Sequence, residues 1–577
     1  MKKLLGLVLC SALLVGAASI GRTAAAPVLE KESYPVILMP GILENALVRD
    51  KGTPKQKIIW FPMDRFLGAF LQHGPAILSC LARGDLDDIR KVGATVVTQI
   101  AEPIRIDPDG TSHYNISTLV SEAKECSYNA LKKRGMLRRV TYGPMMLKEA
   151  AARVGGERAF VFQYDWRMSA VDIAKDLHSF IQDVKALTGS DKVCISGTSY
   201  GCNVLLCYLD AYGGENDLHS VLMNSPAYGG TEIFREMLGS DEPLHINYEG
   251  LFNMFLGNYG VEAELGYLLK LMPKGSIDVI FEGSLEKFIK PYFLSSIALW
   301  GVCPPADYEE MKALLLDPAE NAEMIRKTDA MQNVMARAGE ILRRAQASGV
   351  RVSAIVNEGC PLITSLGSGD VLVDAGHGSG GVCLPIGEHF DESYRPARTV
   401  CVDPTHDHVS YTGSLDLTNA YLPENTWVFY GQMHGQNYWD TRARALSLAL
   451  LTTDDVTDVY SDPAFPQFCE TAMAVSDVSL TLKGSPQSVL HPTDGAVAAV
   501  LENHSRKHAV RIRAIRADGV PYTFSDTQLL LLPGQSREIT LTPTGKPSAR
   551  YGSVTLEYDE LPNLKLHKSR TQYFEIR

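Results

Sequence analysis

A serine between two glycines carries the clearest chemical signal in the sequence. In DKVCISGTSYGCNVLLCYL (191–209) an apolar run ends at Gly197, Ser199 occupies the centre of G-x-S-x-G, and a helical pattern follows Gly201. This order is typical of a nucleophile elbow, in which the serine lies in strained backbone and the glycines let strand and helix cross closely. We therefore predict that Ser199 is the nucleophile of an acyl-transfer reaction.

Acyl transfer also needs backbone N–H donors for the oxyanion. In this motif one donor belongs to the residue after the serine and the other to a loop after an early strand. Tyr200 supplies the first. The apolar run YPVILMP (34–40) continues into GILENAL (41–47), where a turn at Pro40 and Gly41 makes the N–H of Ile42 the predicted second donor.

A histidine that follows the last strand is the expected general base. His434 comes shortly after the apolar run TWVFYG (426–431) and before the helical stretch DTRARALSLALL (440–451). The other loop histidines of this region do not follow such a run. We predict His434 as the base.

The acid is expected after the run RVSAIVNEG (351–359). Asp370, in SLGSGDVLVD (365–374), is the first choice. The alternatives are acids that follow it in the chain, Asp374, Asp403 and Asp407. The D-x-x-H-D-H grouping at 403–408 is also compatible with a bound cation. For the catalytic site around Ser199 we predict no metal.

Alternating elements must hold these side chains in place. From Tyr34 to about Thr453, short apolar runs alternate with helical stretches, which predicts an α/β fold with a mostly parallel sheet covered on both faces. We assign residues 27–470 to an α/β-hydrolase domain. Two segments, 48–155 and 230–345, interrupt it. The first is long and mixed, and the second contains apolar and aromatic clusters, which indicate a cap or lid, or alternatively ordinary helical core.

The C-terminal part has a different pattern. Residues 471–577 contain about seven short strand candidates separated by turn residues, which predicts a β-sandwich accessory domain. They are VSLTLKG, AVAAVLEN, AVRIRAIRA, LLLLPG, REITLTPTG, GSVTLEYDE and TQYFEIR.

The N-terminus has the layout of a secretory signal, because two lysines precede an apolar stretch and then small residues. We predict a signal peptide over residues 1–26 and an exported chain, in a periplasm, an extracellular space or a lysosome-like lumen; an uncleaved anchor is the alternative. Removing these residues changes the net charge from −12 to −15, which argues against nucleic acid as a partner. We expect Cys194, Cys202 and Cys207 to pack as free thiols.

Together these motifs resemble the lecithin:cholesterol acyltransferase and lysosomal phospholipase family. PGILENAL (40–47) resembles its oxyanion loop, IIWFPMDRFLG (58–68) its tryptophan-bearing segment near the lid, and QYDWRMS (163–169) its YDWR signature. GTSYG (197–201) and NSPAYGG (224–230) resemble the elbow and the segment after the next strand. The resemblance covers roughly residues 34–453.

The resemblance implies a serine acyl hydrolase or transacylase of phospholipids or related lipid esters, without metal or other cofactor, working at a membrane or lipid-particle surface. It makes Ser199, Asp370 and His434 the triad and Trp60 a lid or substrate residue. Residues of the YDWR signature are expected to be structural near the site, with Asp165 paired to Arg167 and Trp166 packed.

The sequence departs from the family at three places. Thr198 stands where the family commonly has histidine, no cysteine lies between Gly41 and Ser79 to close the lid loop, and the stretch from Asp370 to His434 is long. Two other interpretations remain open: a serine hydrolase of another acyl class (peptide, thioester or glycan ester), and a non-catalytic secreted lipid-binding protein on the same fold.

Overall fold

The computed structural model describes residues 33–576 except for several internal segments: 61–71, 77–78, 80–82, 84, 141–142, 239–275, 361–367, 386–387, 392, 397–402, 404–405, 471–477, 484–488, 504–507, 547–550 and 562–566. The predicted signal peptide, residues 1–26, lies outside the described residues, as does much of the middle of the second predicted cap segment.

A seven-stranded sheet forms the centre of the predicted α/β domain, and every pairing in it is parallel. In spatial order its strands are β12 (Phe468–Glu470), β11 (Thr426–Tyr430), β8 (Arg351–Glu358), β7 (Leu218–Asn224), β6 (Val193–Thr198), β1 (Val36–Met39) and β5 (Ala159–Val161). Four apolar runs given above and two others, RAFVFQYDW (158–166) and HSVLMNSP (219–226), predicted six of these strands and the α/β class, and both predictions are confirmed. Strand β12 was not predicted.

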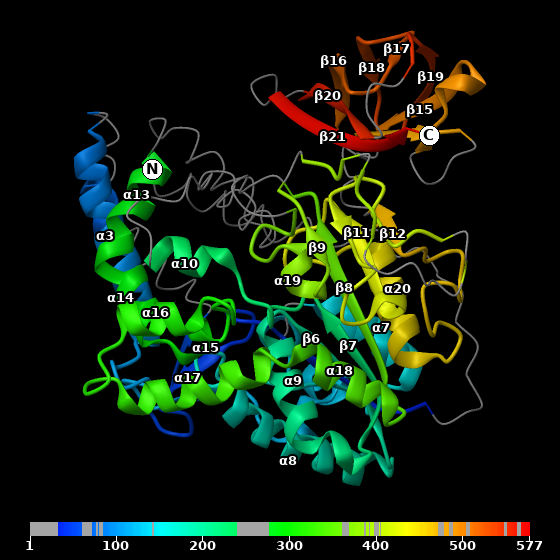
Figure 1. Cartoon of the computed structure of the whole chain (residues 1–577). Coiled ribbons are helices and arrows are strands. Elements are labelled where there is room, and N and C mark those ends of the chain that lie inside the picture. The colour runs from blue at the N-terminus through cyan, green and yellow to red at the C-terminus, as the bar shows by residue number, and fades with distance from the viewer. Residues whose placement is uncertain are drawn as a thin grey trace. The chain divides into compact units, whose positions relative to one another are not determined.

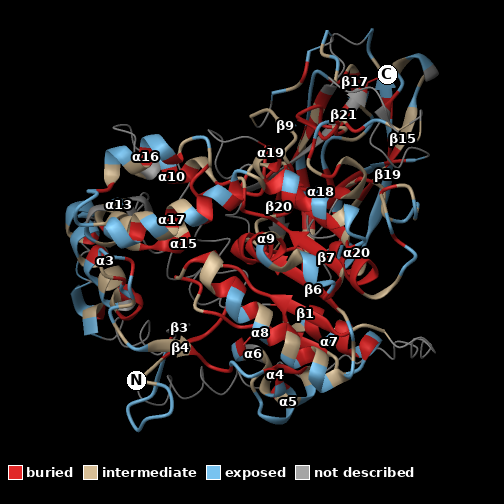
Figure 2. Ribbon diagram, turned by 60° about the horizontal axis from the view of Figure 1, so that its bottom comes forward, coloured by how far each residue is buried: buried red, intermediate tan, exposed pale blue. Residues whose placement is uncertain are grey.

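Helices cover the two faces of this sheet. On one face α9 (Tyr200–Tyr212) packs with α8 (Ala170–Thr188), α17 (Ala322–Met335) and α18 (Ala338–Ala347), and on the other α20 (Thr441–Thr452) packs with α7 (Pro144–Val154). The strands between them are buried on both sides, as the colouring of β1, β6 and β7 in Figure 2 shows. Helix α20 begins where Asp440 caps it by accepting hydrogen bonds from the N–H groups of Arg442 and Ala443.

The two predicted cap segments contact each other. Helix α3 (Leu86–Ala101) of the first segment packs along α13 (Ser276–Ser284) of the second, with an ion pair of 2.8 Å between Arg90 and Glu282. Figure 1 shows these helices side by side.

Shorter elements complete the two segments. The first contains β2 (Leu47–Arg49), β3 (Lys57–Trp60), β4 (Ile116–Thr118), η1 (Glu102–Ile104), α4 (Ala123–Cys126), α5 (Tyr128–Lys133) and α6 (Leu137–Val140). The second contains α10 (Glu232–Leu238), the π-helical turn η3 (Leu285–Ile289), α14 (Lys290–Ser295), α15 (Ile297–Trp300) and α16 (Tyr308–Leu315). Elsewhere in the domain lie η2 (Gly213–Glu215), α19 (Ala375–Ser379), β9 (Val382–Cys383), β10 (Leu415–Asp416) and η4 (Pro423–Asn425).

The C-terminal strands form two sheets that share one apolar core (Figure 1, orange to red). The first contains β13 (Val478–Leu482), β15 (Val497–Asn503), β19 (Ser536–Pro543) and β17 (Tyr522–Phe524). The second contains β14 (Val489–Leu490), β21 (His567–Ile576), β20 (Tyr551–Leu561), β16 (Ala509–Asp518) and β18 (Leu529–Leu531); the turn η5 (Pro492–Asp494) follows β14. Alternate residues of facing strands, such as Leu501 and Ile512, fill the core between them, as in a sandwich.

Eight described cysteines are free thiols, and seven of them are buried. They include Cys194 in β6 and Cys202 and Cys207 in α9, so the prediction for these three is confirmed. Within the described residues, none of the helices combines the length and the apolar character needed to cross a bilayer.

Candidate active site

Ser199 lies at the tip of the turn between β6 and α9. Its backbone angles, φ 55° and ψ −123°, are strained for a residue with a side chain. A Cβ added to Gly197 would come within 2.7 Å of the backbone of Gly201, and one added to Gly201 within 2.8 Å of the carbonyl oxygen of Pro40. The glycines therefore allow the strand, the helix and the loop after β1 to meet at the serine.

Three predicted side chains meet in a hydrogen-bonded chain. The Oγ of Ser199 is 2.7 Å from Nε2 of His434, and Nδ1 of His434 is 2.8 Å from Oδ2 of Asp370. They come from three loops that follow β6, β11 and β8, at the carboxyl ends of parallel strands. This arrangement allows the histidine to take a proton from the serine while the carboxylate orients the ring.

Asp370 is held in place from its other side. Its Oδ1 accepts hydrogen bonds from the N–H groups of Leu372 (3.2 Å) and Val373 (2.9 Å), and its carbonyl accepts from the backbone N–H of His434 (2.9 Å). Val371, with φ 89°, provides the sharp turn. The Asp370 side chain is almost fully buried. Hydrogen bonds to both of its carboxylate oxygens fix its position.

The alternative acids have other contacts. Asp374 caps α19 through a 2.6 Å hydrogen bond from the N–H of His377, and Asp407 accepts a 3.0 Å hydrogen bond from the N–H of Val409. Asp403 accepts a backbone hydrogen bond from His406 through its carbonyl. Of the predicted acids, Asp370 is the one that the structure brings to His434.

The charges around His434 favour its protonated form. Burial opposes protonation, but the carboxylate of Asp370, its hydrogen bond to the ring, and the nearby Glu44 together raise the pKa of His434 above its ordinary value. A base with a raised pKa takes the serine proton more readily, and it must be neutral before it can do so.

The loop after β1 brings Gly41, the residue before the predicted oxyanion donor Ile42, against the serine: a Cβ added to Gly41 would lie 2.8 Å from Cβ of Ser199. The N–H of Glu44 lies 3.4 Å from the carbonyl oxygen of Gly41, which closes a turn with Ile42 and Leu43 at its centre. Leu43 has φ 69°, a value that such a turn demands at its third position and that usually requires glycine. Because the Gly41 carbonyl points into the turn, the N–H of the same planar peptide, which belongs to Ile42, points out of it.

The second predicted donor is Tyr200. It is the first residue of α9, so its N–H has no carbonyl partner within the helix. In the part of the chain that the structure describes, the N–H of Ile42 donates to no other group. Both N–H groups are thus available to a ligand.

Aromatic side chains hold the outer side of this loop. The hydroxyl of Tyr164 donates to the Pro40 carbonyl (2.5 Å), and the indole N–H of Trp60 donates to the Leu43 carbonyl (2.8 Å). The indole N–H of Trp166 is 3.3 Å from the Asn45 carbonyl, and the two tryptophans meet edge to face with centroids 5.5 Å apart. The predicted lid residue Trp60 is therefore tied to the oxyanion loop; residues 61–71, which follow it, lie outside the described residues.

Asp165 and Arg167 form the expected ion pair. Nε and Nη2 of Arg167 lie 2.8 and 2.5 Å from the two carboxylate oxygens of Asp165. The fully buried guanidinium also donates to the carbonyl of Ile104 (3.2 Å) and the hydroxyl of Ser112 (2.8 Å). This pair joins the YDWR segment to the first predicted cap segment, which is a structural role.

Glu44, Tyr164 and Asn45 are parts of the site that the sequence analysis did not single out. The Oε2 of Glu44 accepts a 2.5 Å hydrogen bond from the N–H of Gly41, and burial raises the pKa of this carboxyl to about 7 despite that bond and nearby His434. The signal available in the sequence was an acid and an amide in an otherwise apolar segment after a predicted strand. Asn45 is buried and donates to the carbonyl of Tyr164.

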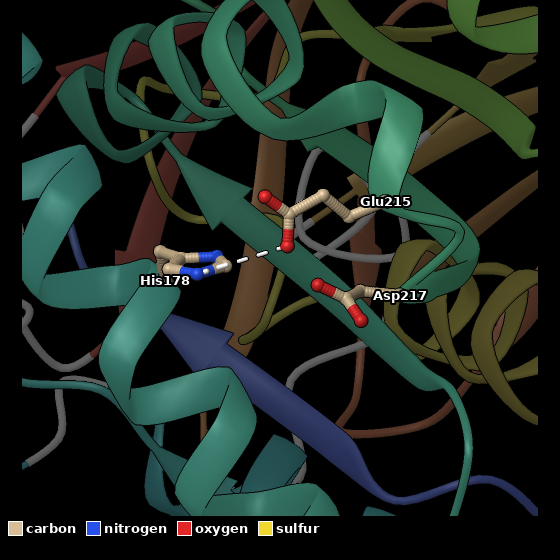
Figure 3. A group of neighbouring side chains, drawn as sticks. All are labelled: His178, Glu215 and Asp217. Carbon is tan, nitrogen blue, oxygen red and sulfur yellow. Dashed lines mark ion pairs between the residues drawn. The ribbon is translucent and has the colours of Figure 1, made fainter.

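Two groups among the described residues have spacings compatible with a cation, and neither lies at 403–408. One group is His178, Glu215 and Asp217 (Figure 3), in which the imidazole of His178 is 3.7 Å from the Glu215 carboxylate. The Asp217 carboxylate is already bound by Lys185 and Gln182 of α8 and by Tyr208 of α9. It therefore links these two helices to the start of β7.

The second group contains Glu232, Asp374 and His377. In it, Asp374 receives the backbone N–H of His377 and lies 3.2 Å from the His377 ring. In the 403–408 segment, His408 is hydrogen-bonded to Gln467 (2.9 Å) and lies 3.4 Å from the hydroxyl of Tyr460. Asp374 and His408 therefore each have protein partners.

No protein-family model matches the chain. No curated protein matches it either. Among solved structures, phospholipase PlaB from Legionella pneumophila is similar over 79% of this chain and 90% of its own, at 12% identity and a TM-score of 0.29.

Two smaller structures are similar over 17% of the chain. The periplasmic chaperone SfaE has 11% identity and a TM-score of 0.15, and the chain covers 57% of it, less than two-thirds of its length. SSP-19, an MSP-domain protein like family member in Caenorhabditis elegans, has 15% identity, a TM-score of 0.14 and 97% of its length covered. Scores this low carry no argument about fold or function, so the resemblance to the acyltransferase and phospholipase family stays a prediction.

Proposed function

We propose that the protein is a serine ester hydrolase or acyltransferase that forms an acyl-enzyme on Ser199. The observation that carries the proposal is the continuous chain from Ser199 Oγ through both nitrogens of His434 to Asp370, with distances of 2.7 and 2.8 Å, at a strained strand-to-helix turn. A structural serine needs neither the strained turn nor a buried histidine and carboxylate behind it.

The proposed reaction has two halves. His434 takes the proton of Ser199 as Oγ attacks the ester carbonyl, and the N–H groups of Ile42 and Tyr200 bind the oxyanion. The imidazolium, stabilised by Asp370, then gives its proton to the leaving alcohol, and an acyl-enzyme remains. Water or a second alcohol, deprotonated by His434, attacks this ester and releases the acid or a new ester.

The proposed substrates are lipid esters. The segment from Leu285 to Ser295 presents half-buried apolar and aromatic side chains, including Phe288 stacked on Tyr292 at 5.3 Å and Phe293 packed against the core. Apolar surface of this kind suits an acyl chain. The resemblance stated from the sequence points the same way, and with the signal-like N-terminus it supports action at a lipid surface in an exported compartment.

An active-site-directed phosphonate tests the mechanism. It is expected to label the mature protein at Ser199, and Ser199→Ala is expected to abolish labelling, with Ser196→Ala, a buried serine of β6, as the matched control that keeps it. Labelling that survives Ser199→Ala would refute the nucleophile assignment.

Lipid products test the substrate class. Purified protein is incubated with mixed phospholipids and neutral lipids, with and without a long-chain alcohol or sterol, and the products are identified. Free fatty acid alone would indicate a hydrolase, and a new ester an acyltransferase. Protein that reacts with the phosphonate at Ser199 and, before labelling, cleaves a soluble ester but none of these lipids would refute the lipid assignment and leave the serine mechanism intact.

A further inference from the structure

The carboxyl group of Glu44 lies between two loops of the site. Its Oε2 accepts the N–H of Gly41 at 2.5 Å, and Gly41 is packed so closely on the nucleophile that an added Cβ would be 2.8 Å from Cβ and 3.3 Å from Oγ of Ser199. Its Oε1 lies 3.0 Å from the point where a Cβ would stand on Gly435, the residue after His434. One carboxyl thus contacts the oxyanion loop and the histidine loop.

The hydrogen bond to Gly41 acts on the turn that presents Ile42. With the Gly41 N–H bonded to the Glu44 carboxyl and the Gly41 carbonyl facing the Glu44 N–H, both peptide groups next to Gly41 are held by one residue. Leu43 adopts its strained φ of 69° inside the same turn. A strained backbone conformation persists only when contacts around it hold it in place. The hydrogen bond from Gly41 to the Glu44 carboxyl is such a contact for the turn that contains Leu43.

Ionisable groups from four parts of the fold interact with Glu44. They are His434 after β11, Tyr438 before α20, Tyr164 after β5, and Cys202 in α9. Burial raises the pKa values of the two tyrosines and of the thiol, so these three groups are neutral near pH 7. His434, already paired with Asp370, changes charge near neutrality, and so does Glu44 itself, because burial raises the pKa of its carboxyl to about 7.

We propose that Glu44 is a positioning residue whose carboxyl group holds the Gly41–Glu44 turn and the His434 loop on either side of Ser199, and whose ionised form stabilises protonated His434. The inference rests on the proposed function. It assigns to this acid two separable effects, one on the geometry of the oxyanion donors and one on the proton affinity of the base.

Glutamine and alanine separate the two effects. Glu44→Gln removes the charge and keeps an oxygen that can accept the Gly41 N–H, whereas Glu44→Ala removes both. Glu320→Gln, at an exposed position of the second cap segment, removes one negative charge away from the site and is the matched control. The full chain is assayed with p-nitrophenyl butyrate, and kcat and KM are measured across pH.

The expected result is a fall in kcat of about 100-fold for Glu44→Ala with little change in KM, because misplacing a catalytic group by about 1 Å costs that much. Glu44→Gln is expected to recover kcat to within about tenfold of wild type. In both variants the acid limb of kcat/KM moves to lower pH, since His434 loses a neighbouring negative charge, and in Glu320→Gln it does not move.

A second measurement is independent of turnover. Histidine-selective NMR, with His434 identified by the signal lost in His434→Asn, follows the titration of its ring, which is expected to have a lower pKa in Glu44→Gln than in wild type. A kcat of Glu44→Ala within threefold of wild type, or an unchanged His434 titration in Glu44→Gln, would overturn the proposal for Glu44. Wild-type protein that neither hydrolyses the ester nor reacts with the phosphonate would instead refute the proposed function.

Discussion

Replacing Asp370 with asparagine is expected to disable the base without changing the shape of the site. The Oδ1 of Asp370 faces two N–H donors, those of Leu372 and Val373, while Oδ2 faces Nδ1 of His434. In Asp370→Asn the amide oxygen must stay with the two donors, so the NH₂ group is turned towards the histidine. Nδ1 then has to accept a hydrogen bond, which places the ring proton on Nε2.

A protonated Nε2 cannot accept the proton of Ser199, from which it is 2.7 Å away. The same tautomer error in a serine protease lowers kcat about 10⁴-fold, which corresponds to about 5.5 kcal/mol of transition-state stabilisation. We expect a loss of this size in kcat for Asp370→Asn, measured by steady-state hydrolysis of p-nitrophenyl butyrate. KM should change little, because the substituted group does not touch substrate.

Asp374→Asn is the matched control. Asp374 lies four residues after Asp370 in the same loop and caps α19 instead of contacting His434. It should keep kcat within about tenfold of wild type. Thermal unfolding of both variants checks that the loop remains folded. A near-normal kcat in Asp370→Asn would refute the role of Asp370, and loss of activity in Asp403→Asn or Asp407→Asn in its place would reassign the acid.

Three further predictions follow from other contacts. Gly41→Ala should lower kcat at least about 100-fold with the fold intact, because the added Cβ would come within 2.8 Å of Cβ of Ser199. A normal kcat would contradict this prediction and would mean that the loop moves away from Ser199 without loss of activity. Arg167→Met should cost about 3–5 kcal/mol in urea unfolding, because it leaves the carboxylate of Asp165 without its buried partner; a change below 1 kcal/mol would contradict this. In wild type, kcat/KM should fall as pH drops through the raised pKa of His434, with the acid limb above pH 6.5; a limb below that value would contradict the assigned environment.

The sheet could be predicted because its strands are buried on both faces. Such strands are continuous apolar runs, as in Val36–Met39 and Thr426–Tyr430, and they stand out from the helical stretches between them. Strand β12 (Phe468–Glu470) was missed because no apolar run marks it, whereas the equally short β5 lies within the run RAFVFQYDW. The extended form of β12 depends on pairing with β11. That pairing is a tertiary contact which local sequence does not record.

The site was partly predictable for a related reason. Ser199 and His434 each follow directly on a recognisable strand, so chain order alone located them. Asp370 is separated from His434 by 64 positions, so the sequence made it the first choice but left Asp374, Asp403 and Asp407 as alternatives. In the structure the turn at Val371 directs the Asp370 carboxylate to the ring. Glu44 escaped prediction because its importance comes from two glycines, Gly41 and Gly435, that approach it closely only in the folded chain.

The loop after β1 also explains why a conspicuous aromatic motif surrounds a site whose chemistry uses none of its side chains. The carbonyls of Pro40, Leu43 and Asn45 are occupied by donors of Tyr164, Trp60 and Trp166. Because a trans peptide directs its C=O and N–H to opposite sides, these bonds fix the orientation of the N–H groups of Gly41, Glu44 and Ala46, the residues that follow the three carbonyls. The Gly41 N–H bonds the Glu44 carboxyl and the Glu44 N–H faces the Gly41 carbonyl, so the aromatic donors and the Glu44 carboxyl hold the same turn, and substitutions among them should change kcat more than KM.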